Sequence, residues 1–318
     1  MPDSRETQLS VIIPIFNEEA NLGLLYERVL SAVAPLSLNF ELIFINDGSR
    51  DRSLVLIQAL AATDSRVKFI SFSRNFGHQI AVSAGLDAAK GEAIVIIDAD
   101  LQDPPELIVD LYRKMQEGYE VVYARRRRRQ GESFMKLLTA KAFYRILRSI
   151  TSVEIPVDTG DFRIMHRKVA EVLRRMPEQQ KFLRGQISWI GFRQTFVEYD
   201  RQSRAGGQTG YTYSKMLRFA MDGITSFSDF PLKMATLIGF AVSGIAFLVL
   251  LYALYSRLIS HDYVPGWASL ITCVLFLGGI QLLTIGIIGE YVGRLSANVK
   301  NRPLYVIDLT NVDKDGAQ

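Results

Sequence analysis

Short apolar runs alternate with longer amphipathic stretches over the first 130 or so residues of the chain. The runs predict β-strands at residues 9–15, 40–46, 67–73, 93–97 and 119–124. Each is almost continuously apolar, which is typical of strands buried on both faces. The stretches between them, such as residues 77–89 and the segment after Pro104-Pro105, have the length and spacing of helices. Strands that alternate with helices predict βαβ units and an α/β domain with a mainly parallel sheet.

The apolar pattern changes near residue 230. Residues 234–256 and 263–289 contain no Asp, Glu, Lys or Arg. Each stretch is longer than the roughly 20 residues that span a bilayer. Two buried core helices are the alternative. The pattern favours a transmembrane helical hairpin with spans at about 234–256 and 267–289, joined by a loop that contains Pro265-Gly266.

The charges that flank this hairpin predict its orientation. Basic residues lie before the first span and after the second, namely Arg218, Lys233, Arg294, Lys300 and Arg302. Because positive charge is enriched in cytoplasmic segments, both termini and the large domain are expected in the cytoplasm. Residues 1–8 are polar, so no signal peptide is expected there. The one cysteine, Cys273, lies in the second span and excludes an intrachain disulfide framework.

Polar clusters follow the predicted strands: Asn17-Glu18, Asp47, Arg74-Asn75, and Asp98 with Asp100. Asn17 is also a candidate N-cap for the first helix. In an open parallel sheet these clusters lie along one edge, where such folds bind ligands. Hard divalent cations prefer carboxylate oxygens, so Asp98 and Asp100 are a candidate metal site. A solvated loop is the alternative.

Two common nucleotide-binding motifs are absent from the sequence. No Gly-x-Gly-x-x-Gly follows the first strand, and no Gly-x-x-x-x-Gly-Lys-Ser/Thr occurs. This weighs against a dinucleotide oxidoreductase and against a P-loop enzyme.

A basic segment follows the fifth strand. Residues 125–129 are all arginine, and residues 134–150 form a helical pattern with an apolar face and a face of Lys141, Arg145 and Arg148. Next to membrane spans, such a helix is expected in the lipid headgroup layer. Lys136 lies near the apolar face, where it could snorkel or bind an anionic headgroup. No aromatic stacking platform accompanies the arginines, so nucleic acid is not an expected partner. Residues 214–230 have a second amphipathic pattern.

Two further segments carry candidate functional residues. Residues 158–163, Asp-Thr-Gly-Asp-Phe-Arg, are either a turn in which Gly160 has positive φ or part of a catalytic site. Residues 201–210 form a basic, glycine-rich loop that contains Arg201 and Arg204.

Four motifs together resemble those of the family-2 (GT-A fold) glycosyltransferases. They are Val-Ile-Ile-Pro-Ile-Phe-Asn-Glu-Glu, Asn-Asp-Gly-Ser, Arg-Asn-Phe-Gly and Asp-Ala-Asp-Leu-Gln-Asp-Pro-Pro-Glu. The chain is most similar to the polyprenyl-phosphate group, which contains dolichol-phosphate mannose synthase and the GtrB-type bactoprenol glucosyltransferases. The resemblance covers essentially the whole chain, including the hairpin.

This resemblance implies an inverting transfer of a hexose from a nucleotide diphosphosugar to polyprenyl phosphate, such as undecaprenyl phosphate, for modification of cell-envelope glycans. Glucose from UDP-glucose is the expected donor sugar, and mannose, GlcNAc and aminoarabinose remain alternatives. It also implies Mg²⁺ or Mn²⁺ as cofactor and a multi-pass protein of the bacterial inner membrane. A homo-oligomer is possible.

The resemblance assigns roles to individual residues. The metal ligands are Asp98, Asp100 and Gln102. The donor is bound by Pro14, Glu18, Asp47, Asp98, Arg201 and Arg204. Asp158, Asp161 and Arg163 lie at the reacting carbon, and Arg125 and Lys136 bind the acceptor phosphate. Asn46 stands where the family commonly has Asp, and no role is assigned to it.

The expected organisation is a glycosyltransferase domain at 1–213, a juxtamembrane helix at 214–231, two spans within 232–292, and a cytoplasmic tail at 293–318. A processive polysaccharide synthase is disfavoured because the chain has no Gln-x-x-Arg-Trp motif and only two expected spans. A non-catalytic lipid-binding scaffold is the alternative from another class, and an intact Asp-x-Asp argues against it.

Overall fold

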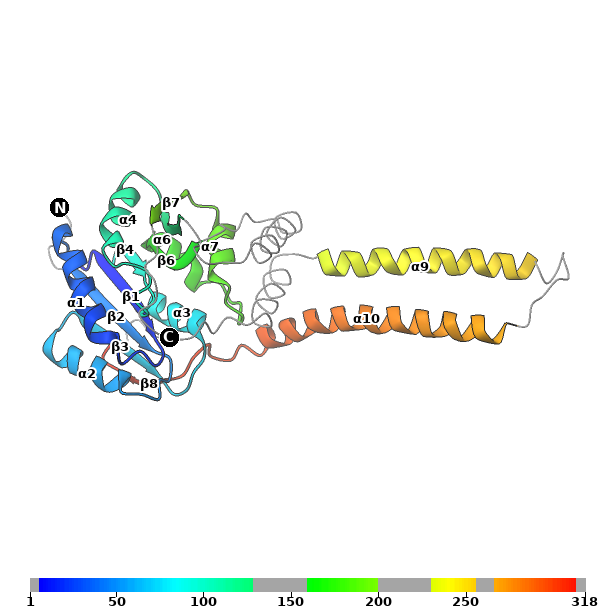
Figure 1. The fold of residues 1–318 in the computed structure, drawn as a ribbon, viewed down its shortest axis with the longest axis horizontal. Coiled ribbons are helices and arrows are strands. Elements are labelled where there is room, and N and C mark those ends of the chain that lie inside the picture. The colour runs from blue at the N-terminus through cyan, green and yellow to red at the C-terminus, as the bar shows by residue number, and fades with distance from the viewer. Residues whose placement is uncertain (1–5, 128–158, 200–229, 256–265, 313–318) are drawn as a thin grey trace. The chain divides into compact units, whose positions relative to one another are not determined.

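A computed structural model describes residues 6–127, 159–199, 230–255 and 266–312 of the chain (Figure 1). The described residues divide into two compact units. The sheet unit comprises residues 6–127 and 159–199 together with residues 302–312. The helix unit comprises residues 230–255 and 266–301. The predicted amphipathic helix at 134–150 and residues 214–229 of the one predicted at 214–230 lie outside the described residues.

The sheet unit contains eight described strands and the helices that connect them. The strands are β1 (Leu9–Ile15), β2 (Phe40–Asn46), β3 (Val67–Phe72), β4 (Ala93–Ile96), β5 (Val121–Arg126), β6 (Thr159–His166), β7 (Gln194–Tyr199) and β8 (Ile307–Thr310). The helices are α1 (Leu22–Val33), η1 (Ala34–Leu36), α2 (Ser53–Thr63), α3 (His78–Ala88), α4 (Leu107–Gln116), α6 (Arg167–Arg174) and α7 (Leu183–Ile190).

The strands form one mainly parallel sheet in the order β7-β5-β6-β4-β1-β2-β3-β8. β1 is parallel to β2 and β4, β2 is parallel to β3, and β5 is parallel to β7. β6 is antiparallel to both β4 and β5, and β8 is antiparallel to β3. The predicted α/β class and the five predicted strands are confirmed. The sequence pattern did not predict β6, β7 or β8.

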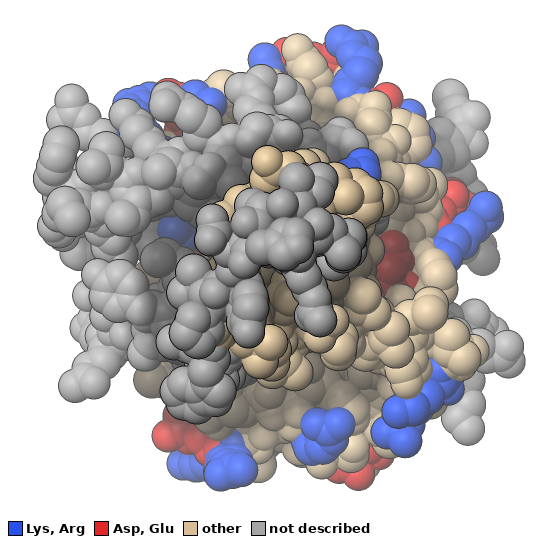
Figure 2. Space-filling model, turned by 90° about the vertical axis from the view of Figure 1, so that its right-hand side faces the viewer, with Lys and Arg blue, Asp and Glu red and all other residues tan. Residues whose placement is uncertain are grey.

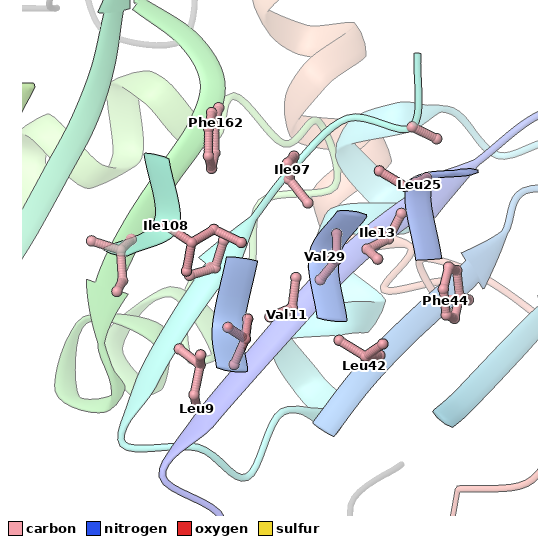
Figure 3. Close-up of a cluster of buried hydrophobic side chains, with 14 of the residues drawn as sticks. Leu9, Val11, Ile13, Leu25, Val29, Leu42, Phe44, Ile97, Ile108 and Phe162 are labelled. Carbon is pink, nitrogen blue, oxygen red and sulfur yellow. The ribbon is translucent and has the colours of Figure 1, made fainter. Parts of the chain in front are cut away.

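Helices cover both faces of the sheet, which is why its central strands are apolar throughout. All seven residues of β1 are buried. Leu9, Val11 and Ile13 lie on the face that packs against α1, α2 and α4 (Figure 3). Ile12 of β1 and Ile43 of β2 lie on the opposite face, against α3, α6 and α7. Side chains alternate between the faces along each strand, so both faces need apolar residues.

Three local predictions differ from the structure. The predicted N-cap at Asn17 is wrong, because α1 begins at Leu22 with Asn21 as its N-cap. Asn17 instead has φ of 56°, and its side-chain oxygen accepts a hydrogen bond from the Arg50 amide at 2.8 Å. The helix after Pro104-Pro105 begins only at Leu107. The turn interpretation of residues 158–163 is wrong for residues 159–163, which form the start of β6.

The helix unit contains α9 (Phe230–Tyr255) and α10 (Trp267–Val299), which contact each other. Two segments are long and apolar enough to cross a membrane: Phe230–Val249, with mean hydropathy 2.0, and Phe276–Val299, with 1.4. At 1.5 Å per residue, each full helix exceeds the roughly 30 Å hydrocarbon thickness of a bilayer. The predicted span 267–289 therefore lies within α10, and the predicted span 234–256 lies within α9 as far as Tyr255, the last residue described there.

The segment predicted as a tail has two structural parts. α10 continues beyond residue 289 as far as Val299. The chain then returns to the sheet unit, where β8 pairs with β3. This return was not visible in the sequence because β8 has only four residues, of which Ile307 alone is partly buried and the other three are exposed.

Charged side chains of both signs share the surface of the molecule. Figure 2 shows lysine and arginine side chains beside aspartate and glutamate side chains around the rim of one face. Several form ion pairs, such as Arg28 with Glu106 at 2.8 Å and Lys168 with Glu120 at 2.9 Å. Exposed pairs of this kind contribute only about 0–1 kcal/mol each, so the apolar packing dominates the stability of the sheet unit.

The contact between α3 and β1 depends on a glycine. A Cβ added at Gly85 would lie 2.3 Å from Cγ2 of the buried Ile12. Gly85→Ala should therefore lower the free energy of unfolding by about 1–3 kcal/mol, because the core is overpacked. Gly23→Ala in α1 is the matched control, since a Cβ there meets nothing within 4 Å. The control should be neutral or stabilising by up to about 1 kcal/mol. Thermal unfolding in detergent would compare them, and equal midpoints would contradict the packing argument.

Candidate active site

The loop that follows β4 carries the Asp-x-Asp motif. β4 ends at Ile96, and the loop contains Asp98, Asp100 and Gln102. Leu101 in this loop has φ of 56°, a conformation that is unfavourable for a residue with a branched apolar side chain. Leu101 packs against the buried core, and the Gln102 amide donates to Asp100 Oδ1 at 3.1 Å. Such strained residues cluster at functional sites, and here the turn fixes the backbone of the motif.

The pairing of β4 with β6 brings a third aspartate to this loop. Ile96 pairs with Arg163 in an antiparallel register. Moving two residues outward along each strand leads from Ile96 to Asp98 and from Arg163 to Asp161. Both aspartates contact the same atom, His78 Nε2. Asp161 Oδ2 lies 3.2 Å from it, and Asp98 Oδ1 lies 3.5 Å from it. Asp98 and Asp161, predicted as site residues on different grounds, therefore lie together.

Asp161 is surrounded by cationic and polar donors from three helices or strands. Arg163 Nη2 lies 3.0 Å from its Oδ1, and Arg184 Nε lies 3.1 Å from the same atom. His78 and Gln79 approach its Oδ2. Arg163 is only 1% exposed, and it also donates to the backbone oxygens of Gly160 and Asp161. Arg163 and Asp161, which the resemblance places together at the reacting carbon, are thus in contact, whereas Asp158 lies outside the described residues.

These contacts determine the charge of Asp161. Burial favours the neutral acid, but Arg184, His78 and Arg163 outweigh it and hold the pKa of Asp161 well below its usual range. Burial likewise opposes the charged form of His78, whereas Asp161 and Asp98 raise the pKa of His78 to about 9. Asp161 is therefore an ionised, hydrogen-bonded carboxylate near neutral pH, and such a group is a poor proton acceptor.

Asp98 is in a different electrostatic state. Burial and the charges of Asp161, Asp103 and Asp100 raise the pKa of Asp98 to about 6, although His78 opposes this shift. Within the described part of the chain, the buried Oδ1 of Asp98 has no hydrogen-bond partner. An acid crowded by other acids, with an unsatisfied buried oxygen, is a suitable ligand for a divalent cation.

The loop after β3 depends on Asp47. The buried Asp47 carboxylate accepts hydrogen bonds from the amides of Phe76, at 2.7 Å, and Gly77, at 3.0 Å. A Cβ at Gly48, which has φ of 67°, would lie 2.5 Å from the Arg74 carbonyl carbon, so only glycine allows this close approach. Burial raises the pKa of Asp47. Asp47, predicted as a donor-binding residue, thus also positions residues 76 and 77.

The other residues of the predicted donor side lie at the ends of β1 and β2. Pro14 lies in β1 beyond Ile12, the last residue of that strand that pairs with β4. The amide of Glu18 donates to Ser53 Oγ at 3.0 Å. Asn46, to which no role was assigned, is buried and donates to Ser71 Oγ at 2.9 Å, so it joins β2 to β3.

Two neighbouring arginines at the end of β5 have different surroundings. Arg125 forms an ion pair with Glu198, and its guanidinium lies 3.4 Å from the centroid of the Phe196 ring. Arg126 Nη2 lies 3.4 Å from the buried Asp103, and its Nε donates to the hydroxyl of Tyr199 at 3.1 Å. The Tyr199 hydroxyl also donates to Asp103. Arg126, which was not predicted, is therefore tied to the Asp-x-Asp loop, and Arg125 is tied to β7.

Four predicted site residues, Asp158, Lys136, Arg201 and Arg204, lie outside the described residues. Conversely, the structure brings unpredicted side chains to the site, among them His78, Gln79, Arg126, Arg184, Asp103 and Tyr199. His78 had one available signal, because it directly follows the polar cluster after the third predicted strand. Asp103 stands in the quoted Asp-Ala-Asp-Leu-Gln-Asp motif and Arg126 in the run of arginines at 125–129, although neither was assigned a role. The positions of Arg184 and Tyr199 depend on the placement of α7 and β7 and had no signal in the sequence.

Comparison with known proteins gives the family context. A family model described as glycosyl transferase family 2 matches residues 10–174. The chain is 50% identical over 304 residues to the uncharacterized glycosyltransferase YkcC of Bacillus subtilis (strain 168), covering 96% of this chain and 94% of the relative. It is 42% identical over 300 residues to the prophage bactoprenol glucosyl transferase homolog of Escherichia coli (strain K12), covering 94% and 98%.

Two more similarities accompany these. The chain is 41% identical over 300 residues to the bactoprenol glucosyl transferase of Shigella phage SfV, covering 94% of this chain and 98% of the relative. Among solved structures, it is similar to mannosyl-3-phosphoglycerate synthase from Rubrobacter xylanophilus, with 16% identity, a TM-score of 0.46, and coverage of 69% and 72%.

The buried arginine of the site can be tested through stability. Arg163→Met removes the buried guanidinium that pairs with Asp161. Breaking a buried ion pair costs about 3–5 kcal/mol. We therefore expect a clear fall in the thermal midpoint of unfolding in detergent. Arg113→Met is the control, because Arg113 is 74% exposed and its pair with Asp110 is weak. An unchanged midpoint for Arg163→Met would mean that Arg184 and His78 suffice to stabilise Asp161.

Proposed function

Because this chain belongs to glycosyl transferase family 2, we propose that it transfers glucose from UDP-glucose to polyprenyl phosphate, such as undecaprenyl phosphate. The observation that carries the proposal is the meeting of Asp98, Asp161 and His78 at the end of β4, in a chain that also has two helices of membrane-spanning length. Relatives of 41–42% identity that are bactoprenol glucosyl transferases support the choice of lipid and sugar.

A divalent cation, Mg²⁺ or Mn²⁺, fits the residues of the Asp-x-Asp loop. Among the described residues, no three His, Cys, Asp or Glu side chains form a complete metal site by themselves. The cation would take oxygens from Asp98 and Asp100, with Gln102 nearby, and further oxygens from the donor diphosphate. When bound, it would neutralise the negative charge of the leaving diphosphate.

The acceptor requires little help in becoming a nucleophile. The second pKa of a phosphate monoester is about 6, so the acceptor oxygen already carries negative charge near neutral pH. Since Asp161 is ionised and engaged by Arg163 and Arg184, we assign it the role of orienting its neighbours. Asp158, two residues before Gly160, remains the candidate for contact with the acceptor. Inversion at the sugar carbon is part of the proposal and follows the family resemblance.

We assign the remaining donor contacts by the same resemblance. Pro14, Glu18 and Asp47 lie at the nucleoside side of the site, and Arg201 and Arg204 contact the diphosphate. For the acceptor phosphate, Lys136 and Arg125 are the residues that the resemblance selects. Arg126 is added here because it contacts Asp103 of the Asp-x-Asp loop, whereas Arg125 is engaged by Glu198.

The proposed location is the bacterial inner membrane, with both termini and the sheet unit in the cytoplasm. Lys233 before the predicted span 234–256, and Arg294, Lys300 and Arg302 after the predicted span 267–289, support this orientation. A polyprenyl phosphate has its phosphate at the membrane surface and its chain in the bilayer. An enzyme anchored by two spans therefore meets this acceptor without extracting it from the lipid.

The metal role predicts the effect of a one-atom change. Asp100→Asn should reduce transfer of labelled glucose from UDP-glucose to undecaprenyl phosphate by at least about 100-fold, because about 3 kcal/mol of transition-state stabilisation is lost. Asp110→Asn on α4 is the matched control, since that side chain is 56% exposed, and it should retain full activity.

Excess chelator should also abolish transfer. Undiminished activity in chelator would refute the proposed role of the metal in transfer. A wild-type protein that makes no lipid-linked sugar from any donor would favour the alternative of a non-catalytic lipid-binding scaffold.

The two arginines at the end of β5 give a paired test of acceptor binding. Arg126→Gln should raise the Michaelis constant for undecaprenyl phosphate about 10-fold or more, since a charge-assisted hydrogen bond contributes about 1.5–3 kcal/mol. Its effect on the constant for UDP-glucose should be smaller. Arg125→Gln should change the lipid constant less than Arg126→Gln does. A larger effect at Arg125 would restore the original assignment of that residue.

A further inference from the structure

The chain that follows α10 forms an extended segment along the edge of the sheet. We call residues 302–311 the C-terminal strap. Its strand β8 pairs with β3, with Thr310 opposite Ile70 and Ile307 opposite Phe72. The side chain of Asn311 adds two hydrogen bonds to the backbone of β3, at 2.6 Å to the Phe69 amide and 3.0 Å to the Val67 oxygen. The strap therefore occupies the edge that β3 would otherwise expose.

One side chain of the strap contacts both β3, which precedes residues 73–77, and the last turn of α3, the helix that follows them. The ring of Tyr305 stacks on Phe72, the last residue of β3, with centroids 5.0 Å apart and an interplanar angle of 23°. Its hydroxyl donates to Asp87 Oδ2, near the end of α3, at 2.9 Å. The Ser73 amide, at the start of the intervening loop, donates to the oxygen of Val306 at 3.0 Å.

Residues 73–77, which follow Phe72 directly, lead to the candidate site. The Phe72 ring also contacts Phe76 edge-on, with centroids 5.6 Å apart. The amides of Phe76 and Gly77 bind the Asp47 carboxylate, and the next residue, His78, contacts Asp98 and Asp161. A continuous set of contacts thus runs from Tyr305 through Phe72 and Phe76 to Asp47.

We propose that Tyr305, which the strap carries to the edge of the sheet, is a positioning residue for the donor side of the site. This inference rests on the proposed function. Residues 73–77 belong to no helix or strand, so their conformation depends on the contacts at their ends. Without the Tyr305 ring, the loop samples more conformations, and the Asp47 and His78 side chains must be ordered again when the donor binds.

Three variants separate this role from general stability. Tyr305→Ala removes both contacts, and Tyr305→Phe keeps the stacking on Phe72 and loses only the hydroxyl. Leu309→Ala is the control on the same strap, because Leu309 is 44% exposed. Tyr305→Ala should raise the Michaelis constant for UDP-glucose about 5- to 10-fold, which corresponds to about 1.0–1.4 kcal/mol and lies within the range for an aromatic pair. The constant for undecaprenyl phosphate should stay within about 2-fold in this variant, because the described acceptor residues Arg125 and Arg126 contact Glu198 and Asp103 rather than residues 73–77.

Rescue by Tyr305→Phe to within about 3-fold of the wild type is expected, because the ring is retained. Leu309→Ala should match the wild type in both constants. An unchanged donor constant for Tyr305→Ala, or equal rises in both constants, would overturn the proposal. If Tyr305→Ala does not fold, Tyr305→Leu takes its place with the same expectation, because it retains apolar volume without the ring.

Amide hydrogen exchange gives a readout that does not depend on the proposed reaction. In Tyr305→Ala, the amides of residues 75–78 should exchange faster than in the wild type, and those of β1 should not. Unchanged exchange in residues 75–78 overturns the positioning role. A wild-type enzyme that is inactive with every donor, combined with faster exchange in the variant, rejects the proposed function and retains the structural part of the inference.

Discussion

The structure of the site depends on how cationic side chains compensate the negative charge of Asp161, which lies beside Asp98. Two buried carboxylates that share a site repel each other, and one of them would normally take up a proton. Here Arg163, Arg184 and His78 surround Asp161 and keep it ionised. The ionised form of Asp98 is therefore the one that burial and the neighbouring carboxylates disfavour, and its pKa rises to about 6. Its Oδ1 has no hydrogen-bond partner in the described structure. One carboxylate is fixed by protein cations, and the other is left suited to an added cation.

This division of roles follows from one antiparallel strand. β6 lies between β4 and β5, and its register with β4 brings Asp161 level with Asp98. The same strand buries Arg163 beneath the site, where it contacts Tyr123 of β5 and the backbone of Gly160. Replacing β6 by a parallel strand would place its carboxyl end, rather than its amino end, at this edge of the sheet. The neighbouring carboxylate would then have to come from another part of the chain.

Distant parts of the chain also converge on the loop after β3. Asp47 arrives from the end of β2 and fixes the amides of Phe76 and Gly77. Tyr305 arrives from the segment that follows α10 and stacks on Phe72. The segment that leaves an apolar helix of membrane-spanning length is thus built into the sheet next to the candidate nucleotide site. Residues 302–311 thus have a structural role that their composition did not indicate.

The sequence by itself determined the α/β class, the first five strands, the two long apolar helices and the candidate metal motif after the fourth strand. These features are local, since a continuous apolar run ended by carboxylates has the same meaning wherever the strand lies in the sheet. The tertiary structure alone decided the partners of Asp161, the different surroundings of Arg125 and Arg126, and the return of the chain as β8. β6 begins with Thr-Gly-Asp, which is typical of a turn, and β8 has only four residues. Strand register and side-chain pairing depend on residues that are far apart in the sequence, so no local pattern contains them.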